Sequence, residues 1–234
     1  MRYDLALVDL DGTLTDSAPG IIASIEHAYD ALDIPRPSEE ALALFVGPPI
    51  EESVVRNGVP AERVPELITA YRSAFTRGGM FDNSVYPGIV DALTALRAAG
   101  LRLCVATSKP EIFARQIVEH FELDGFFEAV CGASMDGTRS TKADVVAHAL
   151  DTMAATERGL PALERIVMVG DREHDVLGAR QHGIETVSVE WGYAPAGEID
   201  EAAPLAVVQT PEELVGLLLG GSRDPGIQGS SRPG

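Results

Sequence analysis

The chain has 234 residues, of which 45% are hydrophobic and 23% charged, so it can form one large domain or a core domain with a smaller insert. Its formal net charge of −18 argues against nucleic acids and anionic membranes as partners and favours bound cations. No apolar run approaches the roughly 20 residues that span a bilayer, and the N-terminal region lacks a signal-peptide pattern. Cys104 and Cys131 are isolated among apolar residues, which indicates a reducing, cytoplasmic location.

A short buried strand is predicted for residues 4–8, where the apolar run DLALV leads to Asp9. The turn residues Asp11, Gly12 and Thr13 follow it. Charged residues seldom end a buried strand without a partner, so this stretch is the first candidate for a functional site.

The segment from about 16 to 82 is predicted to be almost entirely helical. Its first helix begins near Pro19, a residue that is favoured in the first turn. The apolar residues on one face of this helix are Ile21, Ile22, Ile25, Tyr29 and Leu32. Further helices, separated by the loops FVGPPI and NGVPAE, are expected near 38–45, 51–57 and 62–77.

From Tyr86 onward, apolar strands alternate with helices. The expected strands are 101–107, 126–132, 165–170 and 186–191. The expected helices are 88–99, 110–120, 142–153, 173–182 and 211–219. Strands this apolar are typical of a parallel sheet that is covered on both faces. The sequence therefore predicts an α/β fold, a Rossmann-like parallel sheet with helices on both faces and an inserted all-helical cap domain.

The predicted domain boundaries follow from the same pattern. Residues 1–15 and 83–220 would form the Rossmann-like core, and residues 16–82 the helical cap. The remaining residues, 221–234, are rich in Gly, Ser and Pro, so we expect a disordered tail.

Several predicted strands end in polar residues, and in an open parallel sheet these ends form the ligand-binding crevice. Asp9 and Asp11 lie two residues apart in an extended segment, so both side chains point the same way while Leu10 turns into the core. Asp171 and Asp175 reach the crevice from another strand. Such carboxylates repel one another unless a cation bridges them. Because only oxygen ligands are available, the pattern favours Mg²⁺.

Other polar groups at the same edge suit a phosphate. Thr107 and Ser108 offer hydroxyl and N–H groups directly before a helix, where anions bind. Lys142 opens another helix and is one of only two lysines, the other being Lys109. A carboxylate nucleophile, a neighbouring acid–base group, a cation and a lysine are what phosphoryl transfer through an aspartyl-phosphate requires.

Four motifs in this order resemble those of the haloacid dehalogenase-like (HAD) phosphohydrolase superfamily: DLDGTLTDS, ATS (106–108), Lys142 and GDREHD (170–175). The resemblance covers roughly residues 3–220, and the loop FVGPPI is most similar to the phosphoglycolate phosphatase and 5′-nucleotidase-like branch with a helical cap. It implies an Mg²⁺-dependent phosphomonoesterase that hydrolyses a small phosphorylated metabolite, phosphoglycolate- or nucleotide-like. The enzyme would be a monomer or a homodimer.

The resemblance also implies a role for each motif residue. Asp9 would be the nucleophile and Asp11 the general acid–base group. The metal ligands would be Asp9, the backbone carbonyl of Asp11, and Asp171, supported from behind by Asp175 and Gly170. The phosphate would be bound by Thr107, Ser108 and Lys142. The candidate substrate contacts are Gly47, Arg72 and Arg139.

Alternatives stay open at this point. Taken alone, DLDGT is also compatible with a strand-to-turn signal, Thr107 and Ser108 with a helix cap, and Lys142 with a solvated surface residue. A phosphomutase of the β-phosphoglucomutase type shares the motifs. A receiver-like phosphoacceptor signalling domain also gathers an Asp, a Thr and a Lys around Mg²⁺, but it is about half as long and has no helical insert after its first strand.

Overall fold

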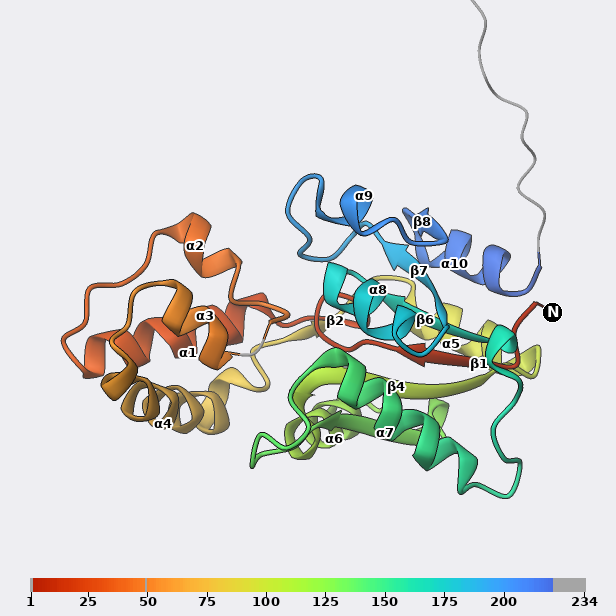
Figure 1. Ribbon diagram of the computed structural model, residues 1–234, viewed down its shortest axis with the longest axis horizontal. Helices are drawn as coiled ribbons and strands as arrows, with labels where there is room; N and C mark the ends of the chain where they lie inside the picture. Colours follow the sequence, from red (N-terminus) through yellow and green to blue (C-terminus); the bar gives the residue numbers. More distant parts are fainter. Residues whose placement is uncertain (1, 49, 221–234) are drawn as a thin grey trace, which may run out of the picture.

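The computed structural model describes residues 2–48 and 50–220 of the chain (Figure 1). Figure 1 shows two parts, a sheet with its covering helices on one side and a group of helices on the other. The predicted disordered tail, 221–234, lies outside the described residues.

The sheet has six strands, all paired in parallel. In spatial order these are β5 (Ala129–Ala133), β4 (Arg102–Pro110), β1 (Leu5–Val8), β6 (Ile166–Gly170), β7 (Glu185–Val189) and β8 (Ala206–Val208). The pairing sets Val8 beside Val105 of β4 and Val169 of β6. These three valines are therefore level, and the polar residues that follow them on the three chains meet at one edge.

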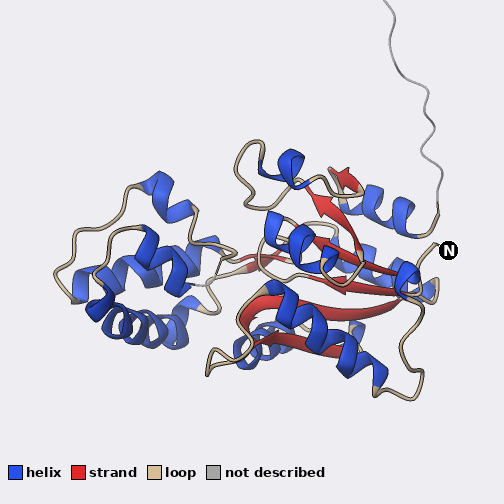
Figure 2. Ribbon diagram, viewed as in Figure 1, coloured by secondary structure: helices blue, strands red, loops and turns tan. Residues whose placement is uncertain are grey.

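Helices cover both faces of the sheet (Figure 2), which confirms the predicted α/β fold class. On β1, Leu5 and Leu7 face one apolar cluster, with α7 (Lys142–Ala154) and α8 (Glu173–Arg180). Ala6 and Val8 face the other, with α5 (Ile89–Ala98), α6 (Glu111–His120) and α10 (Pro211–Leu218). All four β1 side chains are buried, and each fully buried leucine contributes about 1.5–3 kcal/mol to folding.

A two-stranded antiparallel ribbon, β2 (Thr15–Asp16) with β3 (Ser84–Val85), leads to the second group of helices. This helical insert consists of α1 (Ala18–Ala31), α2 (Glu39–Ala43), α3 (Ile50–Arg56), η1 (Ala61–Arg63), α4 (Val64–Ala74) and the π-helical turn η2 (Phe75–Gly79). The single helix predicted at 62–77 is thus three consecutive helical pieces. The ribbon was not predicted, because strands of two residues have no readable periodicity.

Other elements differ from the sequence-based expectation in detail. The expected strand 126–132 begins only at Ala129, because η3 (Asp124–Phe126) precedes it. The short elements η4 (Leu163–Arg165), α9 (Glu198–Ala202) and β8 were not predicted. Within 2–48 and 50–220, no helix combines the length and the apolar character that a bilayer span needs.

Candidate active site

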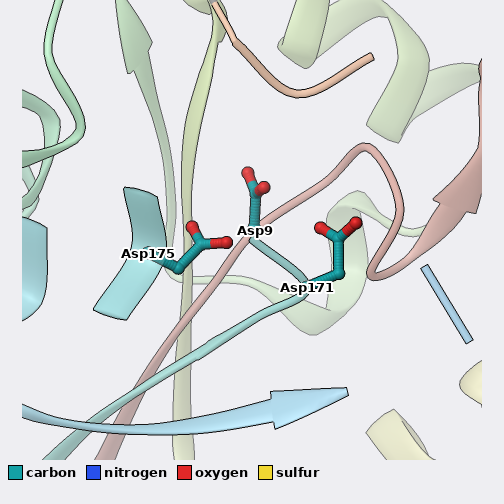
Figure 3. Close-up of side chains that lie close together, drawn as sticks. All are labelled: Asp9, Asp171 and Asp175. Carbon is teal, nitrogen blue, oxygen red and sulfur yellow. The ribbon is translucent and has the colours of Figure 1, made fainter. Parts of the chain in front are cut away.

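Three buried carboxylates meet at the carboxyl edge of the sheet. Asp9 follows β1, Asp171 follows β6, and Asp175 lies in the first turn of α8. One oxygen from each lies within 4.8 Å of the other two. Figure 3 shows Asp9 between Asp175 and Asp171, with the three carboxylates close together. The structure therefore brings together these three predicted site residues.

Lys142, at the start of α7, is the cation within this group. Its Nζ lies 2.9 Å from Oδ1 of Asp9 and 2.6 Å from Oδ1 of Asp175, and it donates a hydrogen bond to the carbonyl of Ala106 at 3.1 Å. Burial alone would lower the pKa of Lys142, but the carboxylates of Asp175 and Asp9 raise it above its ordinary value. The lysine therefore stays charged, and all three of its N–H groups have an acceptor.

The group carries more negative than positive charge. Burial, together with repulsion from Asp175, raises the pKa of Asp9 to about 6, although Lys142 opposes the shift. Burial and the charges of Asp175 and Asp9 also raise the pKa of Asp171 well above its ordinary value. When all three carboxylates are ionised, the one ammonium leaves two negative charges in a buried place, and burial together with this excess raises the pKa values. Such a donor set fits a hard divalent cation that takes oxygen ligands.

Asp171 is held in place by a segment that sequence reasoning missed, residues 191–193. The backbone N–H of Tyr193 donates to Oδ2 of Asp171 at 2.7 Å. The Tyr193 hydroxyl donates to Asp16 at 2.7 Å, beside the start of the helical insert. Gly12 makes the approach from β1 possible, because its φ is +81° and a Cβ there would lie 2.2 Å from Oδ2 of Asp171.

Asp175 is held by the backbone that follows β6. The backbone N–H of Arg172 donates to Oδ2 of Asp175 at 3.1 Å. A Cβ at position 170 would lie 2.2 Å from the Asp175 carboxylate, so glycine is required there. The Arg172 guanidinium pairs with Glu198 at 2.7 Å and also donates to the carbonyl of Val46 in the helical insert. The sequence did not point to this link between sheet and insert.

Asp11 is not a member of the three-carboxylate group and pairs with a lysine of its own. Nζ of Lys109 lies 2.9 Å from Oδ2 of Asp11, and both side chains are at most 9% exposed. The same ammonium lies 4.8 Å from the centre of the Phe75 ring. The β4–β5 register shifts between Thr107 and Pro110, and such irregularities re-aim side chains near functional sites. Lys109 was missed, although its rarity as one of two lysines was a usable signal.

A cavity of about 470 Å³ lies between the sheet edge and the helical insert. From the sheet side it is lined by Asp11, Ser108 and Lys109, and from the insert by Tyr71, Arg72 and Phe75. Of the predicted substrate contacts, Gly47 and Arg72 line this cavity. Asp11 thus connects the carboxylate group to a space that could hold a substrate.

Two other predicted residues are placed differently. Thr107 is buried at the end of β4, where its Oγ1 accepts the N–H of Lys109 at 3.2 Å. Arg139 is not among the cavity-lining residues. Its guanidinium donates to the carbonyl of Gly132 at 2.6 Å and to Glu111 at 3.2 Å. The geometry therefore gives Arg139 a part in holding the loop after β5.

The chain matches the haloacid dehalogenase-like hydrolase family over residues 6–189. It therefore belongs to this family, as the four motifs implied. The tyrosine-protein kinase PtkA of Mycobacterium tuberculosis is 48% identical over 212 residues, which cover 90% of this chain and 70% of that protein. A 5′-nucleotidase of Pseudomonas aeruginosa is 40% identical over 205 residues, covering 87% of this chain and 90% of that protein.

A solved structure shows the same fold. The crystal structure of a predicted phosphatase from Clostridium acetobutylicum superimposes with a TM-score of 0.86 at 38% identity, covering 94% of this chain and 99% of that one. The predicted branch, which includes 5′-nucleotidase-like proteins, and the predicted enzyme class, a phosphatase of this family, are confirmed.

Proposed function

We propose that the protein is an Mg²⁺-dependent phosphomonoesterase that hydrolyses a small phosphorylated metabolite through an aspartyl-phosphate. The observation that carries this proposal is the buried group of Asp9, Asp171 and Asp175 with one lysine, beside a cavity that Asp11 lines. Family membership supports it, because phosphatases of this family typically use Mg²⁺. The predicted cytoplasmic location and the monomeric or homodimeric state stay predictions.

The chain's own residues supply the two chemical steps. Asp9 attacks the phosphorus, and the bond to the leaving oxygen breaks as Asp11 donates a proton to that oxygen. Asp11 then takes a proton from the water that hydrolyses the aspartyl-phosphate and releases inorganic phosphate. Lys142 holds Asp9 in position. Thr107 and Ser108 would bind the phosphoryl oxygens, and Lys142 would join them when a phosphoryl oxygen replaces one of its three present acceptors.

The divalent cation would be held by Asp9, Asp171 and the backbone carbonyl of Asp11. When bound, Mg²⁺ neutralises the charge on the phosphoryl oxygens and on the carboxylates. Asp175 and Gly170 support this group from α8 and from the end of β6.

The helical insert would act as a cap on this site. We propose residues 1–15 and 83–220 as the core and residues 16–82 as the cap. The pairing of β2 with β3 supports this division, because it brings the two connecting segments side by side. A cap that closes over the cavity would exclude water from the first step and select the leaving group.

The test is release of inorganic phosphate from a panel of phosphomonoesters, with Mg²⁺ and with EDTA. We expect EDTA and the Asp9→Asn variant each to abolish the reaction, while circular dichroism shows the variant folded. A variant with wild-type kcat contradicts the mechanism. An isomerised sugar phosphate in place of inorganic phosphate supports the phosphomutase alternative.

The name of PtkA describes phosphoryl transfer to tyrosine for that relative. Transfer to tyrosine can be tested for this chain in the same way, with γ-labelled ATP and a tyrosine-containing protein in place of the ester. Stable label on tyrosine without release of phosphate from any ester contradicts our proposal and favours a kinase.

A further inference from the structure

The basic side chains that line the cavity form ion pairs with acidic side chains. Arg72 and Lys109 are the only two basic side chains among the described residues that line it. Nη2 of Arg72, on α4, lies 2.8 Å from Oε1 of Glu51, on α3, and Lys109 pairs with Asp11 at 2.9 Å. Each of these two cations therefore already has an acidic partner that offsets its charge.

The cavity lining contains more acidic than basic side chains. Glu52 and Asp136 also line the cavity, beside Glu51 and Asp11. A leaving group with its own carboxylate or second phosphate would enter a place where negative charge already exceeds positive. At a separation of 4 Å, two like charges repel by roughly 1–4 kcal/mol, depending on how well water screens them.

The rest of the cavity wall is apolar and aromatic. The rings of Tyr71 and Phe75 stack with centroids 5.6 Å apart, and Phe113 meets Phe75 edge-on at 5.7 Å. Ile21 and Ile68 add aliphatic surface. A volume of about 470 Å³ lies within the range for sites that bury a drug-sized ligand, and it far exceeds the needs of a leaving group as small as glycolate.

We propose that the Glu51–Arg72 pair is a specificity determinant that rejects phosphomonoesters with a second anionic group. The preferred substrates would carry one phosphate and no other negative charge, with an apolar or aromatic face on the leaving group. This inference rests on the proposed phosphatase function. It places phosphoglycolate, one of the substrates that the sequence resemblance suggests, among the poor substrates.

The physical basis is competition for one guanidinium. A carboxylate on the substrate that approaches Arg72 also approaches Glu51, whose charge offsets the attraction of the guanidinium. The Arg72 and Glu51 side chains are 35% and 50% exposed, so water weakens their attraction. The expected effect on kcat/KM is therefore roughly two- to fivefold.

The test compares kcat/KM for phenyl phosphate, adenosine 5′-monophosphate and phosphoglycolate, at one Mg²⁺ concentration. The wild-type protein should prefer the first two. Glu51→Gln removes the acidic partner of Arg72 and should raise kcat/KM for phosphoglycolate roughly two- to fivefold, while changing the value for phenyl phosphate less than twofold. The matched control is Glu52→Gln, which removes the same charge but frees no cation.

Three results would overturn the inference in separable ways. Wild-type protein that hydrolyses phosphoglycolate faster than both other esters refutes the substrate class while leaving the phosphatase function intact. An equal gain in Glu51→Gln and Glu52→Gln, or a gain that survives in Glu51→Gln/Arg72→Gln, assigns the effect to net charge rather than to the pair. Phosphate release from none of the esters refutes the proposed function itself.

Discussion

Replacing Lys142 by methionine tests the charge arrangement of the site directly. Methionine keeps much of the side chain's length but removes the ammonium that Asp9 and Asp175 share. In metal-free protein the variant would leave two buried carboxylates without their cation and a third, Asp171, within 4.8 Å of both. We therefore expect a large loss of stability.

The magnitude follows from the geometry. Removing one partner of a buried ion pair typically costs about 3–5 kcal/mol, because the other charge stays buried and unpaired. The Lys142 side chain is 4% exposed, and those of Asp9 and Asp175 are 7% and 0% exposed. Because water hardly reaches these groups, it can solvate the unpaired charges only weakly. For a chain of this length the loss corresponds to a fall in Tm of roughly 6–20 °C.

The stability loss of Lys142→Met should depend on pH, because the pKa of Asp9 is raised in the folded protein. Burial and Asp175 raise the pKa of Asp9 to about 6, and Lys142 limits that rise. A carboxyl whose pKa is raised on folding binds its proton more tightly in the native state, so its contribution to stability is lost as pH rises through the folded pKa. Without Lys142 the pKa of Asp9 rises further. The stability loss should therefore be larger at pH 7.5 than at pH 5.

The measurement is urea-induced unfolding in EDTA at both pH values, followed by the fluorescence of Trp191, the chain's one tryptophan. The control is Lys109→Met, which removes the only other lysine, whose partner Asp11 lies outside the three-carboxylate group. Lys109→Met also breaks a buried ion pair and so lowers stability, but in a separate thermal scan it should retain the wild-type rise in Tm on adding Mg²⁺. A loss for Lys142→Met of under 1 kcal/mol at pH 7.5, or one as large at pH 5, refutes the reasoning.

Three further outcomes follow from the site. Asp11→Asn should lower kcat by roughly 10²-fold or more in a phosphate-release assay, and an undiminished rate would remove Asp11 from its acid–base role. Added Mg²⁺ should raise Tm less at pH 5 than at pH 7.5. Burial raises the pKa values of Asp9 and Asp171, so protons compete with the metal for these carboxylates at the lower pH. A Tm rise that is the same at both pH values contradicts this prediction. Tyr193→Phe removes a hydrogen bond to charged Asp16, so the free energy of unfolding should fall by about 1.5–3 kcal/mol. Its Mg²⁺-dependent Tm shift should persist, because the N–H to Asp171 remains, and loss of that shift would argue against a separate role for the hydroxyl.

The sheet and the carboxylate group were accessible from sequence for simple geometric reasons. Apolar strands without alternation indicate a covered parallel sheet, and the carboxyl ends of such strands share an edge. That reasoning was sufficient to bring Asp9 and Asp171 together. The i, i+2 spacing of Asp9 and Asp11 predicted that both side chains reach the site, but not that they have different partners. Both lie at the site, but Asp9 joins the carboxylates and Asp11 pairs with Lys109, facing the cavity.

What the sequence did not reveal depends on contacts between distant segments. Lys109 reaches Asp11 where the β4–β5 register shifts, and no local pattern announces such a shift. Arg172 joins Glu198 and Val46, which lie 26 and 126 residues away in the chain. Asp171 accepts a hydrogen bond from the backbone N–H of Tyr193, and a backbone donor cannot be recognised from the identity of the side chain.

The use of lysine in this chain follows from the geometry of the two aspartates. Of 18 basic residues, the only two lysines are Lys109 and Lys142, and each pairs with an aspartate of the first motif. An ammonium is a compact point charge with three rotatable donors, whereas a guanidinium is a wide planar fork. Lys142 needs three acceptors in different directions, and Lys109 lies over the Phe75 ring while it contacts Asp11. A guanidinium would need a wider planar space and would offer its donors in a fixed plane, so it matches neither arrangement as closely as the ammonium does.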